Sequence, residues 1–93
     1  MSAPTADEQL ASLRDEIDTI DRVLLETLAR RRDVVSRMRE AKAAFALPRI
    51  DAARESAVRD RWLSVARESE LPDTLALALL ALVLADSRAV VAR

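Results

Sequence analysis

The sequence contains no cysteine, no histidine and no glycine among its 93 residues. Without cysteine there is no disulfide, thiolate nucleophile or zinc–thiolate site. Without histidine the commonest general base and metal ligand is missing, and so is any Ser–His triad. Without glycine there is no phosphate-binding loop of the Walker or Rossmann type. We therefore predict neither a metal nor a cofactor, and an enzyme of this composition must act through charge and positioning.

The sequence also lacks an excess of one charge and a long apolar run. Its 15 basic and 16 acidic residues give a formal net charge of −1, which creates no field for nucleic acid or an anionic membrane. The longest apolar run, Leu75–Ala85, is well short of the ~20 residues that span a bilayer, so we expect a buried helix segment there. No basic, apolar leader precedes Leu10, which favours a cytoplasmic protein.

What the sequence does contain is helical periodicity. We predict an all-α fold of three helices in a single domain over residues 1–93, with residues 1–6 expected to be disordered. The expected helices run from about Thr5 or Asp7 to about Phe45, from Asp51 to about Ser69, and from Pro72 or Asp73 almost to Arg93.

Local signals support these boundaries. Thr5 and Glu8 have the spacing of a capping box, and Asp51 is a plausible N-cap. We expect the second helix to bury three apolar side chains, Val58, Trp62 and Val65. Because no glycine is available, we expect the connections to be built from Pro, Asp and Ser.

The length of the first helix predicts the assembly. About 38 residues at ~1.5 Å each make a rod of roughly 55 Å, whereas a compact monomer of this size has a diameter near ~30 Å. Two shorter helices cannot cover such a rod. We therefore predict an intertwined homodimer in which the long helices pack side by side.

One cation interrupts the apolar stripe of the first helix. The stripe comprises Leu10, Leu13, Ile17, Ile20, Leu24, Thr27, Arg31, Val34, Met38 and Ala41. A guanidinium on a buried seam is costly unless an anion meets it. For Arg31 a salt bridge inside the dimer and a bound anionic ligand are both open, whereas Arg30 and Arg32 are read as solvated.

Two other cations lie beside the same stripe, Arg14 next to Leu13 and Lys42 next to Ala41. Either alone is typical of a flanking side chain that reaches toward water. Together with Arg31 they span about 40 Å of one helix, too far for a single site. In an antiparallel dimer, Arg14 of one chain approaches Arg31 and Lys42 of the other, which gives two equivalent cationic pockets.

The order of several short motifs resembles that of the all-helical, AroQ-class chorismate mutases, over nearly the whole chain. The motifs are Leu13-Arg14-Asp15-Glu16-Ile17-Asp18, Leu28-Ala29-Arg30-Arg31-Arg32, Ala41-Lys42, Asp51-Ala52-Ala53-Arg54-Glu55 and Asp86-Ser87. The resemblance implies an isomerase that converts chorismate to prephenate in the biosynthesis of phenylalanine and tyrosine.

The resemblance also implies roles for individual residues. Arg14, donated by the second subunit, and Arg31 would hold the two carboxylates of chorismate, and Lys42 would contact a carboxylate and the ether oxygen. Glu55, helped by Asp51, would receive the C4 hydroxyl. Ser87 would touch a carboxylate, and Arg54 would support the pocket.

The chain departs from the family pattern at Val91, where the family usually has glutamine or glutamate to bond the ether oxygen. Valine cannot make that bond, and Arg88, where the family tends to be apolar, is a candidate replacement or a solvent-facing residue. The departure also leaves room for a related substrate.

Three alternatives remain open at this point. On the same scaffold the protein could be an isochorismate–pyruvate lyase or a mutase acting on 4-amino-4-deoxychorismate. It could also be a non-catalytic helical dimerisation or regulatory module, in which the cations pair with carboxylates across the interface. Whichever of these holds, an enzyme of the aromatic pathway is a candidate protein partner.

Overall fold

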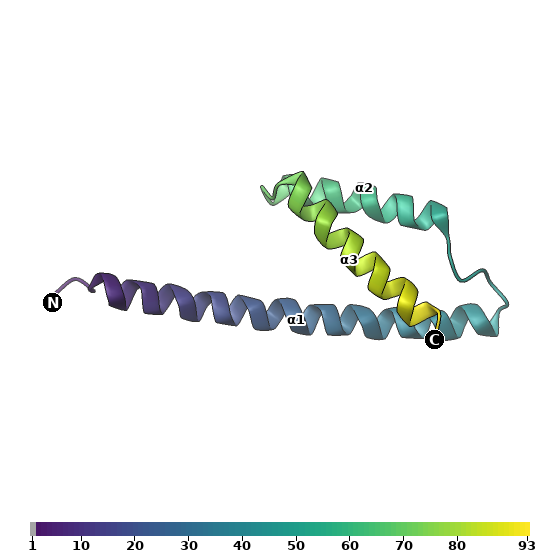
Figure 1. The fold of residues 1–93 in the computed structure, drawn as a ribbon, viewed down its shortest axis with the longest axis horizontal. Coiled ribbons are helices and arrows are strands. Elements are labelled where there is room, and N and C mark those ends of the chain that lie inside the picture. Colours follow the sequence, from purple (N-terminus) through teal and green to yellow (C-terminus); the bar gives the residue numbers. More distant parts are fainter. Residues whose placement is uncertain (1) are drawn as a thin grey trace. The chain divides into compact units, whose positions relative to one another are not determined.

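The computed structural model describes residues 2–93, which form three helices and no strand. Helix α1 comprises Ala6–Ala44, α2 comprises Ala52–Glu68 and α3 comprises Asp73–Val91 (Figure 1). The predicted all-α architecture is therefore confirmed. The described residues fall into two units, one ending at Asp33 and the other formed by Val34–Arg93.

Helices α1 and α2 begin where their capping residues predict, whereas Pro72, before α3, makes no side-chain cap hydrogen bond. The backbone N–H of Glu8 donates to Thr5 Oγ1 at 3.1 Å, ahead of α1. The N–H of Arg54 donates to Asp51 Oδ1 at 3.0 Å, which confirms Asp51 as the N-cap of α2. Each cap satisfies an N–H group that the first helical turn leaves without a partner. Disorder was expected over residues 1–6. Of these, Ala6 is already helical, and Met1 lies outside the described residues.

The ends of α1 and α2 add a feature that the expectation about turns did not include. Ala46 (φ 52°) and Glu70 (φ 58°) occupy the left-handed region that glycine usually fills. The Leu47 N–H donates to the Lys42 carbonyl at 2.8 Å, and the Leu71 N–H donates to the Ala66 carbonyl at 2.8 Å. These are Schellman-type endings. In a chain without glycine, alanine and glutamate therefore take the left-handed positions, while the connections also contain Pro48, Ser69 and Pro72, as expected.

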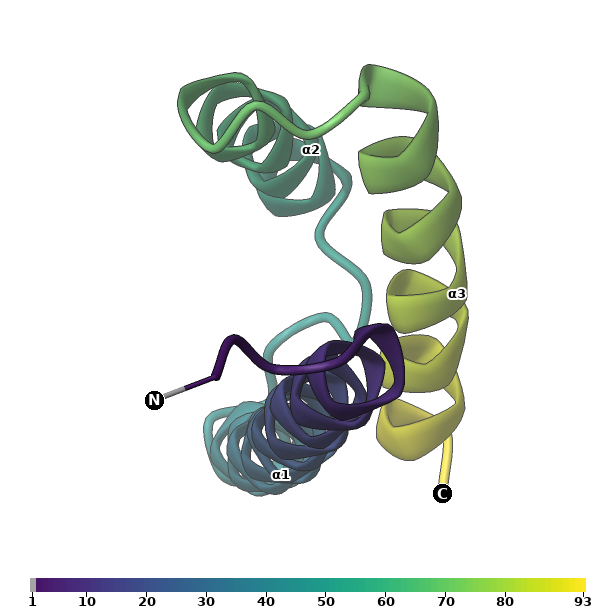
Figure 2. The same ribbon diagram turned by 90° about the vertical axis from the view of Figure 1, so that its left-hand side faces the viewer.

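Helices α2 and α3 form a hairpin joined by residues 69–72 (Figures 1 and 2). Its core is small and entirely apolar, and α3 supplies most of it. The buried side chains are Ala66, Ala76, Leu80, Val83 and Val90. The α3 members recur every three or four residues, or at multiples of that spacing, so one face of the helix is buried.

The other faces of the hairpin correct two expectations about burial. Val58 and Trp62 are half-buried, and Val65 is 48% exposed, because Ala66, about 100° further round α2, takes the contact with α3. Within Leu75–Ala85, Leu75 and Leu82 are exposed. The apolar run is therefore buried on one side only in the single chain.

Helix α3 is also the one helix among residues 2–93 that is long and apolar enough to cross a membrane, by length and composition alone. The core helix of a soluble protein meets the same criterion, so this is weak evidence for a membrane span. Asp86 and Arg88 in its last turns would be costly inside a bilayer.

Candidate active site

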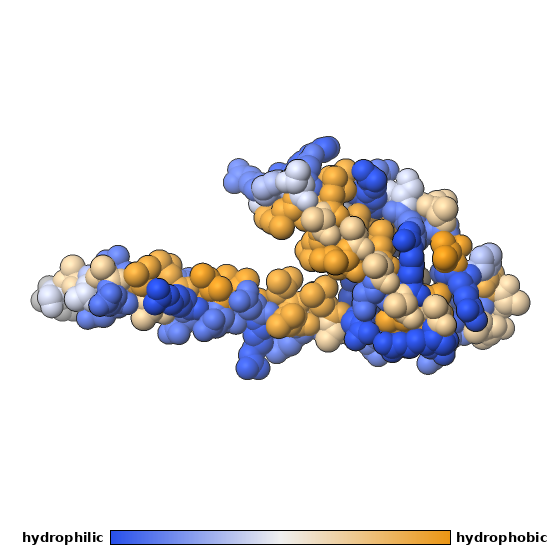
Figure 3. All heavy atoms as spheres, in the orientation of Figure 1, coloured by the Kyte–Doolittle hydropathy of each residue, from blue (hydrophilic) through white to orange (hydrophobic). Residues whose placement is uncertain are grey.

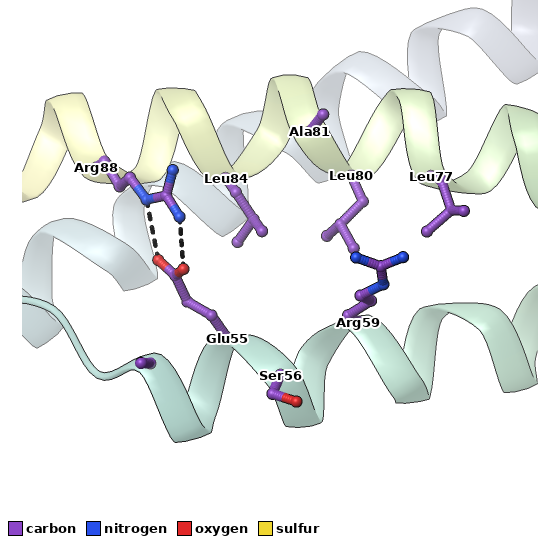
Figure 4. A pocket seen from close by; sticks show the side chains of 9 residues that line it. Glu55, Ser56, Arg59, Leu77, Leu80, Ala81, Leu84 and Arg88 are labelled. Carbon is purple, nitrogen blue, oxygen red and sulfur yellow. Dashed lines mark hydrogen bonds and ion pairs between the residues drawn. The ribbon is translucent and has the colours of Figure 1, made fainter.

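A groove of about 550 Å³ runs between α2 and α3 (Figure 4), within the range of small-molecule sites. Its lining residues are Ala52, Glu55, Ser56 and Arg59 from α2 and Leu77, Leu80, Ala81, Leu84 and Arg88 from α3. Within each helix these positions are three or four apart, which is the spacing of one helical face. The groove therefore has an apolar wall from α3 and a polar wall from α2, with Arg88 at its end.

A two-bond ion pair links the walls of this groove. Arg88 Nε donates to Glu55 Oε1 at 3.0 Å, and Arg88 Nη2 donates to Glu55 Oε2 (Figure 4). The Arg88 side chain is 54% exposed and the Glu55 side chain 27% exposed. The hydrogen bonds from Arg88 hold the pKa of Glu55 below its usual value, and those to Glu55 raise the pKa of Arg88. Glu55 is therefore a carboxylate at neutral pH.

A second ion pair joins the opposite end of the hairpin. Arg67 Nη2 donates to Asp73 Oδ2 at 3.0 Å, and Arg67 Nε donates to Asp73 Oδ1 at 3.4 Å. These bonds raise the pKa of Arg67. Because one pair joins the start of α2 to the end of α3 and the other joins the end of α2 to the start of α3, the helices are antiparallel. The Arg67–Asp73 pair lies outside the groove.

A second pocket, of about 250 Å³, lies at the end of α1 and is strongly cationic. Its lining residues are Arg39, Lys42, Ala43, Ala46, Leu47, Arg49, Val91 and Arg93. The Lys42 ammonium donates to the Arg49 carbonyl at 3.1 Å, which ties the side chain to the connection between α1 and α2. No carboxylate side chain lines this pocket, so the arrangement favours an anion.

The structure brings the predicted site residues together in two groups. Glu55 and Arg88 share the groove, whereas Lys42 and Val91 share the cationic pocket. Arg14, which is exposed, and Arg31, which is half-buried, belong to the unit that ends at Asp33.

The remaining predicted residues lie near the ends of α2 and α3. Asp51 and Arg54 are joined by the N-cap hydrogen bond, so one Asp51 oxygen holds the helix start. The Ser87 hydroxyl donates to the Val83 carbonyl one turn earlier, at 2.9 Å, and Ser87 is half-buried.

Four cations that line the two pockets had not been singled out from the sequence. Arg59 follows Glu55 by four residues, and this spacing on one helical face is a signal that could have identified it. Arg39, Arg49 and Arg93 come from three different segments. No periodicity connects them, because their proximity depends on how the chain folds back after α1.

Among residues 2–93, no group of three or more Asp or Glu side chains is placed to hold a metal ion. The charged side chains that line the two pockets are those of arginine, lysine and glutamate.

The fold is an all-helical domain, and one of its two pockets is lined by four cations and no carboxylate side chain. The family model of chorismate mutase type II matches residues 13–91, and the chain belongs to this family. This finding confirms the resemblance seen in the sequence motifs.

One relative supports the same family more weakly. The T-protein of Enterobacter agglomerans is 42% identical over 40 residues, which is 43% of this chain and 11% of the relative. The match thus covers only about a tenth of that relative's length. No solved structure matches the chain.

Proposed function

We propose that this protein is a chorismate mutase that converts chorismate to prephenate in the biosynthesis of aromatic amino acids. The observation that carries the proposal is the family match over residues 13–91, a range that contains all seven residues to which a catalytic or binding role is assigned below. The reaction is an intramolecular [3,3] rearrangement that needs no nucleophile, base or metal. The lack of histidine and cysteine is therefore compatible with catalysis.

The work of the site is to hold a dianion in its reactive conformation and to stabilise negative charge on the ether oxygen. Positioning of this kind can lower a barrier substantially, and fixed donors stabilise the developing charge. We assign Arg31, and Arg14 from the second subunit, to the two carboxylates, since a guanidinium pairs with a carboxylate through two hydrogen bonds. Lys42 is assigned to the ether oxygen. Its place among arginines, with no carboxylate side chain in the pocket lining, supports that role.

The other proposed roles concern the hydroxyl and the edge of the site. Glu55 accepts a hydrogen bond from the C4 hydroxyl, helped by Asp51, whose second oxygen is not used by the N-cap bond. Arg54 supports this corner of the site. Ser87 contacts a carboxylate, and its half-buried position on α3 supports a contact with the ligand.

The active form that we propose is an intertwined homodimer, in which each site receives Arg14 from the partner. The apolar stripe of the unit that ends at Asp33 is uncovered in the single chain: Leu13, Ile17 and Ile20 are 54%, 54% and 64% exposed. Figure 3 shows apolar atoms along one side of this part of α1. Burying a leucine or isoleucine side chain contributes about 1.5–3 kcal/mol, so a stripe of this length favours a second copy.

The location that we propose is the cytoplasm, since the substrate belongs to a soluble biosynthetic pathway. In this account the apolar α3 packs in the interior of the dimer and does not enter a membrane.

A direct assay with three substrates tests the proposed function. Purified protein is incubated separately with chorismate, isochorismate and 4-amino-4-deoxychorismate, and the products are separated and identified. We expect prephenate from chorismate at a rate well above the uncatalysed one. Pyruvate release from isochorismate, with no prephenate from chorismate, would instead identify a lyase. A protein that binds none of the three and changes none of them would be a structural or regulatory module.

A further inference from the structure

Arg88 gives the α2–α3 groove a charge pattern that the proposed catalytic roles do not require. Two of its N–H groups point at the two oxygens of Glu55 (Figure 4). The pair as a whole is neutral. The remaining lone pairs of the Glu55 carboxylate stay available, since a carboxylate offers about four acceptor positions.

The other charged group on the groove lining is Arg59, one turn beyond Glu55 on α2. Figure 4 shows the Arg59 side chain directed toward the same gap between the helices. The lining thus carries two guanidinium groups, Arg59 and Arg88, and one carboxylate, Glu55. A group that approaches Glu55 from the groove therefore meets a net positive lining. Asp51, assigned above to help Glu55, is not part of that lining, and one of its oxygens bonds the start of α2.

This balance distinguishes two kinds of substituent. A hydroxyl is uncharged and donates one hydrogen bond to a free lone pair of Glu55, so the guanidinium groups cost it little. An ammonium would be attracted by Glu55 but repelled by Arg88 and Arg59, and like charges brought together in a site reduce affinity. If Arg88 were absent, Glu55 would lose its paired guanidinium and the lining would no longer be net positive, since only Arg59 would face it. The ammonium would then be repelled less.

We propose that Arg88 is a specificity-determining residue: by pairing with Glu55 it makes the site select a substrate that presents a hydroxyl over one that presents an ammonium. The inference rests on the chorismate mutase activity proposed above and names a residue that sets its substrate class. Arg88 acts here through Glu55, as a positioning residue.

The pairing also has a consequence for the pH dependence of activity. Because hydrogen bonds from Arg88 lower the pKa of Glu55, the carboxylate persists to lower pH than an ordinary glutamate. Removing Arg88 returns the pKa toward its usual value. The acid limb of the pH–rate profile with chorismate, where Glu55 gains a proton, should then move to higher pH in the variant.

The test compares chorismate with 4-amino-4-deoxychorismate in the wild type, Arg88→Gln and Arg67→Gln. Arg67→Gln is the matched control because it removes the other two-bond ion pair between α2 and α3, outside the groove. We expect the wild type to prefer the hydroxyl substrate in kcat/KM. Arg88→Gln should reduce that preference by about tenfold, mainly through a lower KM for the ammonium substrate, and Arg67→Gln should leave it unchanged.

Several outcomes would overturn the inference. These are a wild type that prefers the ammonium substrate, an unchanged preference in Arg88→Gln, and an equal change in Arg67→Gln. If circular dichroism shows that Arg88→Gln does not fold, Arg88→Lys serves instead. The Arg88→Lys variant keeps the positive charge and should keep the preference for the hydroxyl substrate. Loss of that preference in Arg88→Lys would refute the charge argument. A wild type that converts neither substrate would refute the proposed function, and this inference with it, before any variant is compared.

Discussion

Val91 is the residue at which this chain departs from the pattern of its family. It is the last residue of α3, it is half-buried, and it lines the same pocket as Lys42. A side chain at this position therefore shares a pocket with the ammonium that we assign to the ether oxygen. Valine offers that oxygen no donor. Arg88, one turn earlier, is engaged with Glu55, which favours its role in the groove over replacement of the missing donor.

We predict that Val91→Gln raises kcat for chorismate by about tenfold, because its amide N–H can reach the charge that grows on the ether oxygen. The gain should be smaller than a full oxyanion-donor effect, since the pocket is not shaped for an amide. Steady-state kinetics measure it, with Val91→Met as a control of similar length that has no donor. An equal effect of Met and Gln would show that size, and not hydrogen bonding, matters at this position.

The sequence singles out individual candidate residues better than it identifies the residues that they contact. Arg31 stands out because it interrupts an apolar stripe, and Arg88 because it stands where the family that the chain resembles tends to be apolar. The pairing of Arg88 with Glu55 spans 33 positions and depends on the register of the α2–α3 hairpin, which no local pattern encodes. The sequence could not predict that Arg39, Arg49 and Arg93 line the same pocket as Lys42 either.

At the scale of the helices, the starts were easier to predict than the ends. A start is set by a side chain that bonds the first turn, as Thr5 and Asp51 do, and such residues are recognisable in sequence. The ends of α1 and α2 depend on residues in the left-handed conformation. Neither alanine nor glutamate favours this conformation, so Ala46 and Glu70 could not be identified from the sequence. Burial on α3 follows the helical period, but which face is buried depends on α2.

The left-handed Glu70 leads to a prediction about stability. Because a residue with a Cβ pays roughly 1–2 kcal/mol in this region, Glu70→Gly should raise the free energy of unfolding by about 1 kcal/mol in urea denaturation at fixed protein concentration. Glu70→Gln controls for the lost charge and should have little effect. Glu68→Gly, inside the last turn of α2, should lower the stability by about 0.5–1 kcal/mol. Destabilisation by Glu70→Gly would show that Glu70 is not left-handed in solution.

At the scale of the whole molecule, the account depends on a second chain. The stripe in residues 6–33 is apolar and exposed, and so are Leu75 and Leu82 of α3. One chain cannot place Arg14 and Lys42 in one site if both lie on the same long helix, because helical rise separates them by about 40 Å. An antiparallel pair of chains removes this separation and makes each site depend on both copies.

The measurement that tests this claim most directly is complementation between two inactive variants. Arg14→Ala and Arg31→Ala are each expected to lose most of their activity toward chorismate, while sedimentation shows that each remains a dimer. Mixed in equal amounts, unfolded and refolded together, they form heterodimers in which one site receives an intact Arg31 from one chain and an intact Arg14 from the other. We predict recovery to about a quarter of the wild-type activity, as random pairing of two chains with two shared sites requires. A mixture no more active than its components, although heterodimers form, would contradict a site shared between two copies.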